Sequence, residues 1–180
     1  MFKKITTLLV MLAVSSLAFA DTNNGIAVIN TDKIRLETKA GQSIMKQLEE
    51  LQNKFKDKVA KLQKDFDGQK AELDKQKTVL GKEVFAKKEA EFNNKYNEAR
   101  KQLQQEAGNM EQMQQAALNE FNVVAMDVIN VLAKEGKYTQ IFPAELLIYG
   151  DSKADITSQV IAAVDKKIDH IALKTPESAK

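Results

Sequence analysis

The chain has 180 residues, of which 43% are hydrophobic and 29% charged, with a formal net charge of +2. It contains no Cys, no Trp and a single His, His170. The absence of Cys excludes disulfide scaffolds, cysteine nucleophiles and Cys-rich zinc sites, and the single His argues against His-based triads. Because no glycine-rich phosphate loop occurs either, the sequence predicts no enzyme and no cofactor.

Residues 1–20 have the pattern of a secretory signal peptide. Two lysines form the positive start, an apolar run follows, and Ala18 and Ala20 are the small residues before the expected cleavage site. We therefore expect the mature chain to begin at Asp21. The alternative, a retained membrane anchor, would need about 20 apolar residues, and this run is shorter. No later segment is expected to span a membrane.

Export sets the expected compartment of the mature chain. No Cys follows the signal, so a lipoprotein is excluded, and the bacterial periplasm is the expected location. That compartment lacks ATP, so the activity should depend on binding energy alone. Removal of the two signal lysines leaves 25 Lys and Arg against 25 Asp and Glu.

The mature chain begins with a strand pattern and continues into a long helical segment. Residues 26–30 form a short apolar, β-branched run that predicts a buried strand, and a linker or short helix follows up to residue 40. Residues 42–134, here called the arm, are rich in Lys, Glu, Gln, Ala and Leu and contain no Pro. This composition is typical of long helices.

Apolar residues recur three or four positions apart through both halves of the arm, which predicts two amphipathic helices. In the first half the pattern repeats every 11 residues, as from Phe55 to Phe66, so the apolar stripe remains on one face of a nearly straight helix. We expect an antiparallel hairpin with its tip at residues 78–82, around Gly81, with Gly68 as the alternative. The first helix, from Gln42 to Leu80, should then extend roughly 58 Å.

Beyond the arm, the sequence predicts two further strands, at 138–142 and 146–149, with a turn between them. A last helix follows up to Ile168, with Asp155 as its cap, and residues 174–180 are expected to form a frayed tail.

The two ends of the mature chain, residues 21–41 and 135–180, are expected to form a small α+β unit, here called the body. Three short strands and one helix enclose too little core for stability alone. Their exposed edges invite pairing with other copies. The body is therefore predicted to be an oligomerisation unit, which involves Ile26, Val28, Ile141, Phe142, Leu146 and Ile148.

Basic side chains gather in the distal arm. Between Lys54 and Lys101 there are 14 Lys or Arg and 9 Asp or Glu. One interpretation is a solvated coiled-coil surface, and the other is attraction to acidic chains or anionic lipid surfaces. Nucleic acid is not an expected partner, because the chain has only two arginines and no recognition motif. The predicted basic tip comprises Lys70, Lys75, Lys77, Lys82, Lys87 and Lys88.

Apolar side chains of the arm are the second group of candidate contacts. Side chains at such spacing usually pack between helices, whereas the functional interpretation is an adaptable surface for varied apolar partners. The candidates are Phe55, Phe66, Phe92, Tyr96, Met110 and Met113.

The two ends of the mature chain resemble the Skp/OmpH family of periplasmic chaperones. The resemblance is carried by the signal peptide, the first strand, the Lys- and Gln-rich hairpin, the closing strands, and the run Asp155-Ile156-Thr157-x-x-Val160 after Tyr149. It implies a jellyfish-like homotrimer with a shared β-rich body, whose three arms surround a cavity. In this family the cavity holds unfolded outer-membrane β-barrel proteins without ATP. The resemblance also suggests lipopolysaccharide as an anionic partner, although it assigns no residues to that contact.

Two features differ from the family pattern. The mature chain is neutral overall, whereas family members are often markedly basic. The chain also continues to Lys180, beyond the expected end of the family's last helix.

Two functions from different classes are compatible with the sequence. The first is an ATP-independent holdase, whose arms hold an unfolded chain through many weak contacts. The alternative is a structural or adaptor protein of the envelope, whose hairpin tip docks one folded partner. Such docking would require an apolar tip, for which the candidates are Val79, Leu80, Val84 and Phe85.

Overall fold

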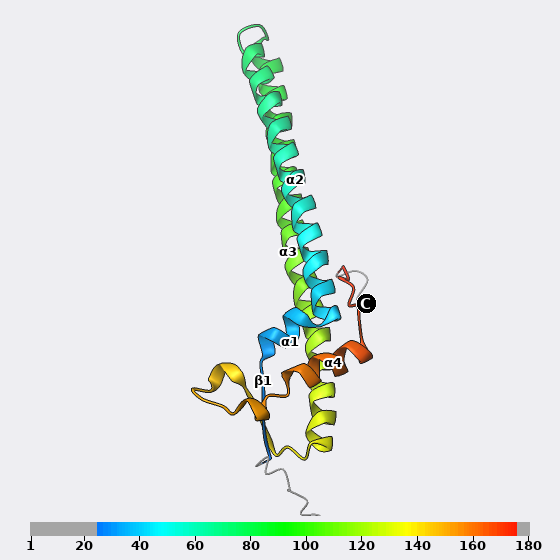
Figure 1. Cartoon of the computed structure of the whole chain (residues 1–180). Helices are drawn as coiled ribbons and strands as arrows, with labels where there is room; N and C mark the ends of the chain where they lie inside the picture. Colours follow the sequence, from blue (N-terminus) through cyan, green and yellow to red (C-terminus); the bar gives the residue numbers. More distant parts are fainter. Residues whose placement is uncertain (1–24, 176–180) are drawn as a thin grey trace, which may run out of the picture.

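A long helical hairpin rises from a small α+β body in the computed structural model, which describes residues 25–175 (Figure 1). The predicted cleavage residues Ala18, Ala20 and Asp21 lie outside the described residues. The elements in chain order are β1 (Ile26–Ile29), α1 (Thr31–Glu37), α2 (Lys39–Gln76), α3 (Lys82–Glu135), β2 (Gln140–Pro143), the 3₁₀ turns η1 (Ala144–Leu146) and η2 (Ser152–Ala154), and α4 (Thr157–Lys167). The predicted α+β class with a helical arm is confirmed.

The arm is a pair of antiparallel helices of unequal length. Helix α2 has 38 residues and α3 has 54, which correspond to lengths of about 57 Å and 81 Å. The chain reverses at residues 77–81, and Gly81 precedes the first residue of α3. Because α3 is the longer helix, its last turns continue past the start of α2 and enter the body (Figure 1).

The sheet of the body has two parallel strands, β1 and β2, with Ala27 opposite Ile141 and Val28 opposite Phe142. Parallel strands need a long crossover connection, and here the whole arm is that connection. Successive residues of a strand point to opposite faces. Ala27 and Ile29 are buried in the core, so Val28 and Ile26 point away from it.

The core lies where the root of the arm meets the body. Apolar side chains from β1, α1, α2, α3 and α4 form one buried cluster around the crossing of α3 and α4 (Figure 1). Its members are Ala27, Ile29, Ile34, Ala40, Ile44, Leu48, Ala117, Phe121, Ala125, Val128, Ile156, Val160, Val164 and Ile171. The distal arm contributes none of them, so the hairpin beyond its root is held by the helix seam alone.

A buried threonine separates α1 from α2. The backbone N–H of Thr38 donates to the Ile34 carbonyl at the end of α1, 3.2 Å away. Its side-chain oxygen accepts from the backbone N–H of Gly41, 3.2 Å away, at the start of α2. A Cβ atom at Gly41 would lie 1.7 Å from the Arg35 carbonyl oxygen, so only glycine fits there.

The strand predicted at residues 146–149 is wrong for the described chain. The segment forms the η1 turn, closed by the Leu147 N–H donating to the Ala144 carbonyl at 3.1 Å, and then an exposed loop. An apolar, β-branched run forms a strand only where a neighbouring strand receives its hydrogen bonds. Within the described residues the sheet consists of β1 and β2 alone, and no strand pairs with this segment.

Helix α3 also departs from expectation, because part of it is long and apolar enough to cross a membrane by length and composition. Length and composition alone do not establish a membrane span, since a helix that enters a protein core can share them. Phe121, Ala125 and Val128 on α3 belong to the buried cluster. Asp127 and Glu120 on the same helix form ion pairs with Lys167 and Lys174.

The expected frayed tail is partly wrong as well. Lys174 forms an ion pair with Glu120, at 3.1 Å, and Leu173 is half-buried against the body. Residues 176–180 lie outside the described residues.

A hydrogen-bonded network of β1 and α4 leads to the first testable prediction. The Asp155 carboxylate accepts from the Thr157 N–H at 2.8 Å and from the Thr157 hydroxyl, whose oxygen accepts from the Asn30 N–H at 2.9 Å. The hydrogen bonds from Thr157 lower the pKa of Asp155 from its ordinary 3.8. Replacement of Asp155 with Ala should cost about 1 kcal/mol of stability near neutral pH.

The sign of the pH dependence follows from the lowered pKa. The stabilising bonds form with the ionised carboxylate, so they are fully present above the unfolded pKa and are lost as the pH falls through the lower folded pKa. The free energy of unfolding in urea should therefore differ less between the Asp155→Ala chain and the unmodified chain at about pH 2.5 than at pH 7. A gap of equal size at both values would contradict this assignment.

Candidate functional site

The face of the sheet that points away from the core is apolar and uncovered. Ile26 and Phe142 are exposed and Val28 is half-buried, and all three lie on this face, here called the outer face. Ile141 belongs to the opposite face and packs against the buried cluster. Of the predicted oligomerisation residues in the strands, Ile26, Val28 and Phe142 thus lie on the outer face, whereas Ile141 lies on the face that meets the core.

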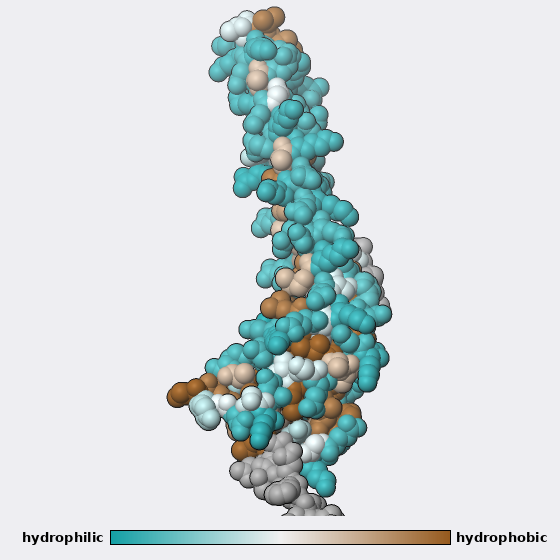
Figure 2. Space-filling model, in the orientation of Figure 1, coloured by the Kyte–Doolittle hydropathy of each residue, from teal (hydrophilic) through white to brown (hydrophobic). Residues whose placement is uncertain are grey.

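The loop after β2 adds a second uncovered apolar group. The side chains of Leu146, Ile148 and Tyr149 are 75%, 107% and 87% exposed. They lie on a loop that projects sideways from the body, and apolar surface is visible at its end (Figure 2). An open hollow of about 220 Å³ separates the loop from Val28, so the loop and the outer face adjoin.

Glu145 fixes this loop to the start of α1. Its carboxylate accepts from the backbone N–H of Thr31, at 3.1 Å, and from the Thr31 hydroxyl, at 3.3 Å. Its own backbone N–H and the groups of Thr31 hold the pKa of Glu145 below its ordinary value. The loop is therefore anchored at one end while its apolar side chains remain free of the chain's own core.

Aromatic side chains gather midway along the arm. The Phe66 ring on α2 meets the rings of Phe92 and Tyr96 on α3 edge to face, with centroids 5.9 Å and 5.3 Å apart. The Arg100 guanidinium lies 5.9 Å from the Tyr96 ring centroid. Such contacts stabilise by about 0.5 to 1.5 kcal/mol each beyond the area they bury. The cluster joins the two helices where the body core no longer does.

The predicted client-contact residues lie along the helix seam. Phe55, Phe66, Phe92 and Met110 are half-buried, Met113 is buried, and only Tyr96 is exposed. These side chains therefore hold the hairpin together and offer partial surface.

Exposed apolar groups that the sequence analysis did not select lie at the root of the arm. Leu36 and Met45 are about half exposed and line, with Leu48, an open hollow of about 700 Å³. Val123 and Val131 are exposed on α3. Their positions off the regular stripe of each helix were the available signal, because an apolar side chain outside the seam faces solvent.

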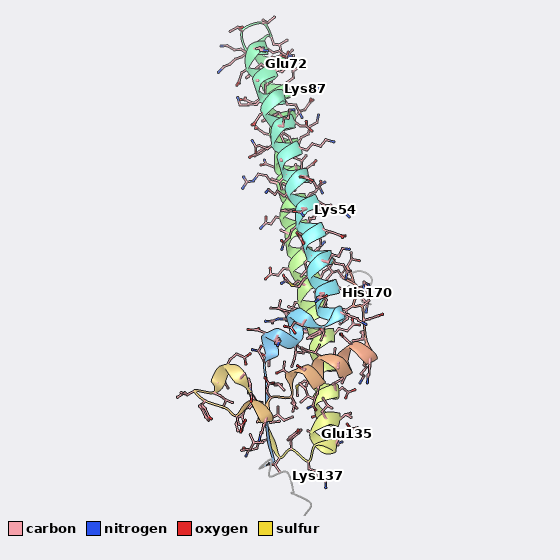
Figure 3. All side chains as sticks on the ribbon, in the orientation of Figure 1. Lys54, Glu72, Lys87, Glu135, Lys137 and His170 are labelled. Atoms are coloured by element: carbon pink, nitrogen blue, oxygen red, sulfur yellow. The ribbon has the colours of Figure 1, made fainter. Side chains whose placement is uncertain are left out.

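The distal arm presents lysines to solvent on all sides. In Figure 3 charged side chains project outward along the whole hairpin, with Lys54 midway and Lys87 near its end. Lys70 pairs with Asp74 at 2.5 Å, and the Lys88 ammonium donates to the Gln76 side chain at 2.7 Å. Among the described residues no ion pair engages the other four predicted basic-tip residues, Lys75, Lys77, Lys82 and Lys87.

The hairpin end also carries two exposed apolar side chains. Val79 is 81% exposed and Val84 is 51% exposed, whereas the neighbouring Leu80 and Phe85 are half-buried. Figure 2 shows apolar surface at this end of the arm, above a predominantly hydrophilic stem.

Comparison with known proteins identifies a family and a similar solved structure. A family model described as outer membrane protein (OmpH-like) matches residues 25–164, which is more than half of the chain. The chain is also similar to the crystal structure of a candidate OmpH-like outer membrane chaperone from Caulobacter crescentus CB15. The TM-score is 0.78 at 18% identity, over 84% of this chain and 89% of that one. At this identity the likeness shows a shared fold. No curated protein matches the chain.

Proposed function

The chain belongs to the OmpH-like outer membrane protein family, and from that premise we propose that it is an ATP-independent periplasmic holdase. Its clients would be unfolded outer-membrane β-barrel proteins, which it would keep from aggregating before they insert into the membrane. The family is one of chaperones and not of enzymes, in agreement with the absence of recognisable catalytic motifs from the sequence.

The observation that carries this proposal is the arm itself. Beyond its root the hairpin buries few side chains, Leu73 among them, so most of its residues serve as surface. A surface of lysines and partly exposed aromatic side chains makes many weak contacts with an unfolded chain. Weak contacts in large number give high total affinity while each one exchanges quickly, which suits release without ATP.

The second component of the proposal is a homotrimer. The outer face and the loop together expose Ile26, Phe142, Leu146, Ile148 and Tyr149 on one small body. A cluster of exposed apolar residues on this scale is typical of an interface. β2 is paired along one edge only, and a free strand edge favours pairing with another copy. Three bodies joined in this way would place three arms around a common space.

The basic tip should increase the rate at which the holdase captures clients. Replacement of Lys75, Lys77 and Lys82 with Gln should slow association with an acidic unfolded barrel protein by about three- to tenfold at low salt. High salt should remove the difference between variant and unmodified chain, because it screens exposed charges. Stopped-flow fluorescence with a labelled client measures both rates.

A matched variant carries the same change in charge on the body and at the adjoining end of α3. Lys134, Lys153 and Lys166 are exposed and lie away from the tip. Their replacement with Gln should leave the association rate within about twofold of the original. Equal slowing by both triple variants would show that net charge, and not the tip, governs capture.

An adaptor function is the second candidate, and the exposed Val79 and Val84 at the hairpin end favour it. Replacement of both with Ser leaves the half-buried seam residues Leu80 and Phe85 in place. A holdase with distributed contacts should suppress client aggregation nearly as well after this change. If the double variant loses client protection altogether, client contacts are concentrated at the tip and are not distributed along the arm. The adaptor function is favoured if the unmodified chain gives no client protection.

A further inference from the structure

The segment after α4 is seated on the arm root by hydrogen bonds to its backbone. This segment, Ile168–Lys174, is called the strap. The Gln47 side-chain amide of α2 donates from Nε2 to the Ile171 carbonyl, at 2.8 Å, and accepts at Oε1 from the Leu173 N–H, at 3.1 Å. One amide thus satisfies both backbone groups that an extended chain presents on one side. Recognition of this kind depends little on sequence.

From His170 to Lys174 the residues of the strap alternate between exposed and buried or half-buried. Ile171 is 1% exposed within the buried cluster, Ala172 is exposed, and Leu173 is half-buried. The period of two is that of an extended chain lying on a surface. Strands of membrane β-barrels have the same alternation of apolar and polar residues.

Polar contacts hold both ends of the strap. The Nδ1 atom of His170 lies 2.5 Å from the Ser43 hydroxyl on α2, and the Lys174 ammonium lies 3.1 Å from the Glu120 carboxylate on α3. Figure 3 shows His170 beside the root of α2. The contacts of the strap therefore span both helices of the arm. We call Ser43, Gln47 and Glu120 the strap site.

The strap lies beyond the part of the chain that the family model matches, which ends at residue 164. The strap site can bind an extended segment in three ways. The Gln47 amide bonds to backbone N–H and C=O groups, apolar surface receives every second side chain, and the Glu120 carboxylate pairs with a basic residue.

We propose that the strap site binds an extended segment of an unfolded client, and that the strap occupies this site in cis as a competitor. The inference rests on the proposed holdase function and names one site for it. The segment recognised has apolar side chains at alternate positions and a basic residue at its C-terminal side, like Ile171, Leu173 and Lys174. Such segments occur in barrel strands before they fold.

Competition of this kind raises the apparent dissociation constant for the client in inverse proportion to the fraction of time for which the strap is open. If the strap is open for one tenth of the time, the apparent dissociation constant is about tenfold higher than the intrinsic one. The strap thus limits how tightly this site holds a client segment, so release remains possible.

A reversible covalent lock tests the proposal without removing any part of the core. The chain contains no Cys, so replacement of Ser43 and His170 with Cys introduces the only thiols. Oxidation should close the strap and weaken binding of a urea-unfolded barrel protein about tenfold or more. Reductant should restore the affinity, and it should not affect the unmodified chain. Intact mass confirms the disulfide.

A chain that ends at Lys167 provides the converse experiment. It should bind the client about tenfold more tightly than the full chain, and a peptide with the sequence of residues 168–175 should compete. In this shortened chain Gln47→Ala should remove the gain, whereas Gln52→Ala, at an exposed glutamine on the same helix, should not.

The outcomes separate this inference from the proposed function. Equal client affinity of the oxidised and reduced forms would overturn the inference while aggregation is still suppressed, and the strap would then be part of the body core only. A peptide that binds the shortened chain without displacing the client would overturn it as well. If the full chain holds no client in either redox state, the holdase function itself fails.

Discussion

A Gly41→Ala chain is expected to lose about 3 kcal/mol or more of folding stability. The added Cβ would lie 1.7 Å from the Arg35 carbonyl oxygen and 3.0 Å from the Thr38 hydroxyl oxygen. The first contact is with backbone, which cannot rotate away as a flexible side chain can. The junction between α1 and α2 must therefore open, and this exposes Thr38 and the buried Ile34.

Urea or thermal unfolding followed by circular dichroism measures this loss. Small domains are stable by only about 5 to 15 kcal/mol, so the expected change is a large fraction of the total. Gly68→Ala is the matched control, because Gly68 lies inside α2 with nothing within 4 Å of an added Cβ. That change should stabilise by about 0.5 to 1 kcal/mol. Similar shifts for both variants would contradict the assigned role of Gly41.

A chain with Leu146→Asp and Ile148→Asp is expected to be monomeric. Both side chains are exposed in the single chain, so the helical circular dichroism signal should persist. In a trimer that buries them, each apolar side chain contributes about 1.5 to 3 kcal/mol, and an unpaired buried carboxylate adds a further cost. Together these terms weaken association by roughly a thousandfold or more.

Light scattering after size exclusion gives the mass of each assembly. Val79→Asp with Val84→Asp is the matched control, since it places the same two charges on exposed apolar positions at the arm tip. The control should retain the mass of the unmodified assembly. An unchanged mass for the Leu146 and Ile148 variant would place the interface elsewhere, and the exposed α3 residues Val123 and Met126 would be examined next.

The helices of the arm could be predicted because their signal is local. Apolar residues three or four positions apart define one face of a helix whatever lies on that face, as the run through Phe55 and Phe66 illustrates. The strand at residues 146–149 was predicted wrongly for the opposite reason. A strand depends on a partner strand, and no partner lies beside this loop in the described chain.

The sequence also left open which strand face meets the chain's own core. Both faces of β1 are apolar, so alternation alone could not distinguish Ala27 and Ile29 from Ile26 and Val28. The role of Gln47 could not be predicted, because the arm contains many glutamines and only this one bonds to the backbone groups of Ile171 and Leu173. Long-range contacts of this kind leave no local pattern.

The central claim is best tested by diluting a urea-unfolded outer-membrane β-barrel protein into buffer with the purified mature chain, without ATP. Light scattering then reports both aggregation of the client and the mass of any complex. The account predicts that aggregation is suppressed and that the complex contains three copies of this chain per client. Aggregation as rapid as that of the client alone, with no complex formed, would contradict it.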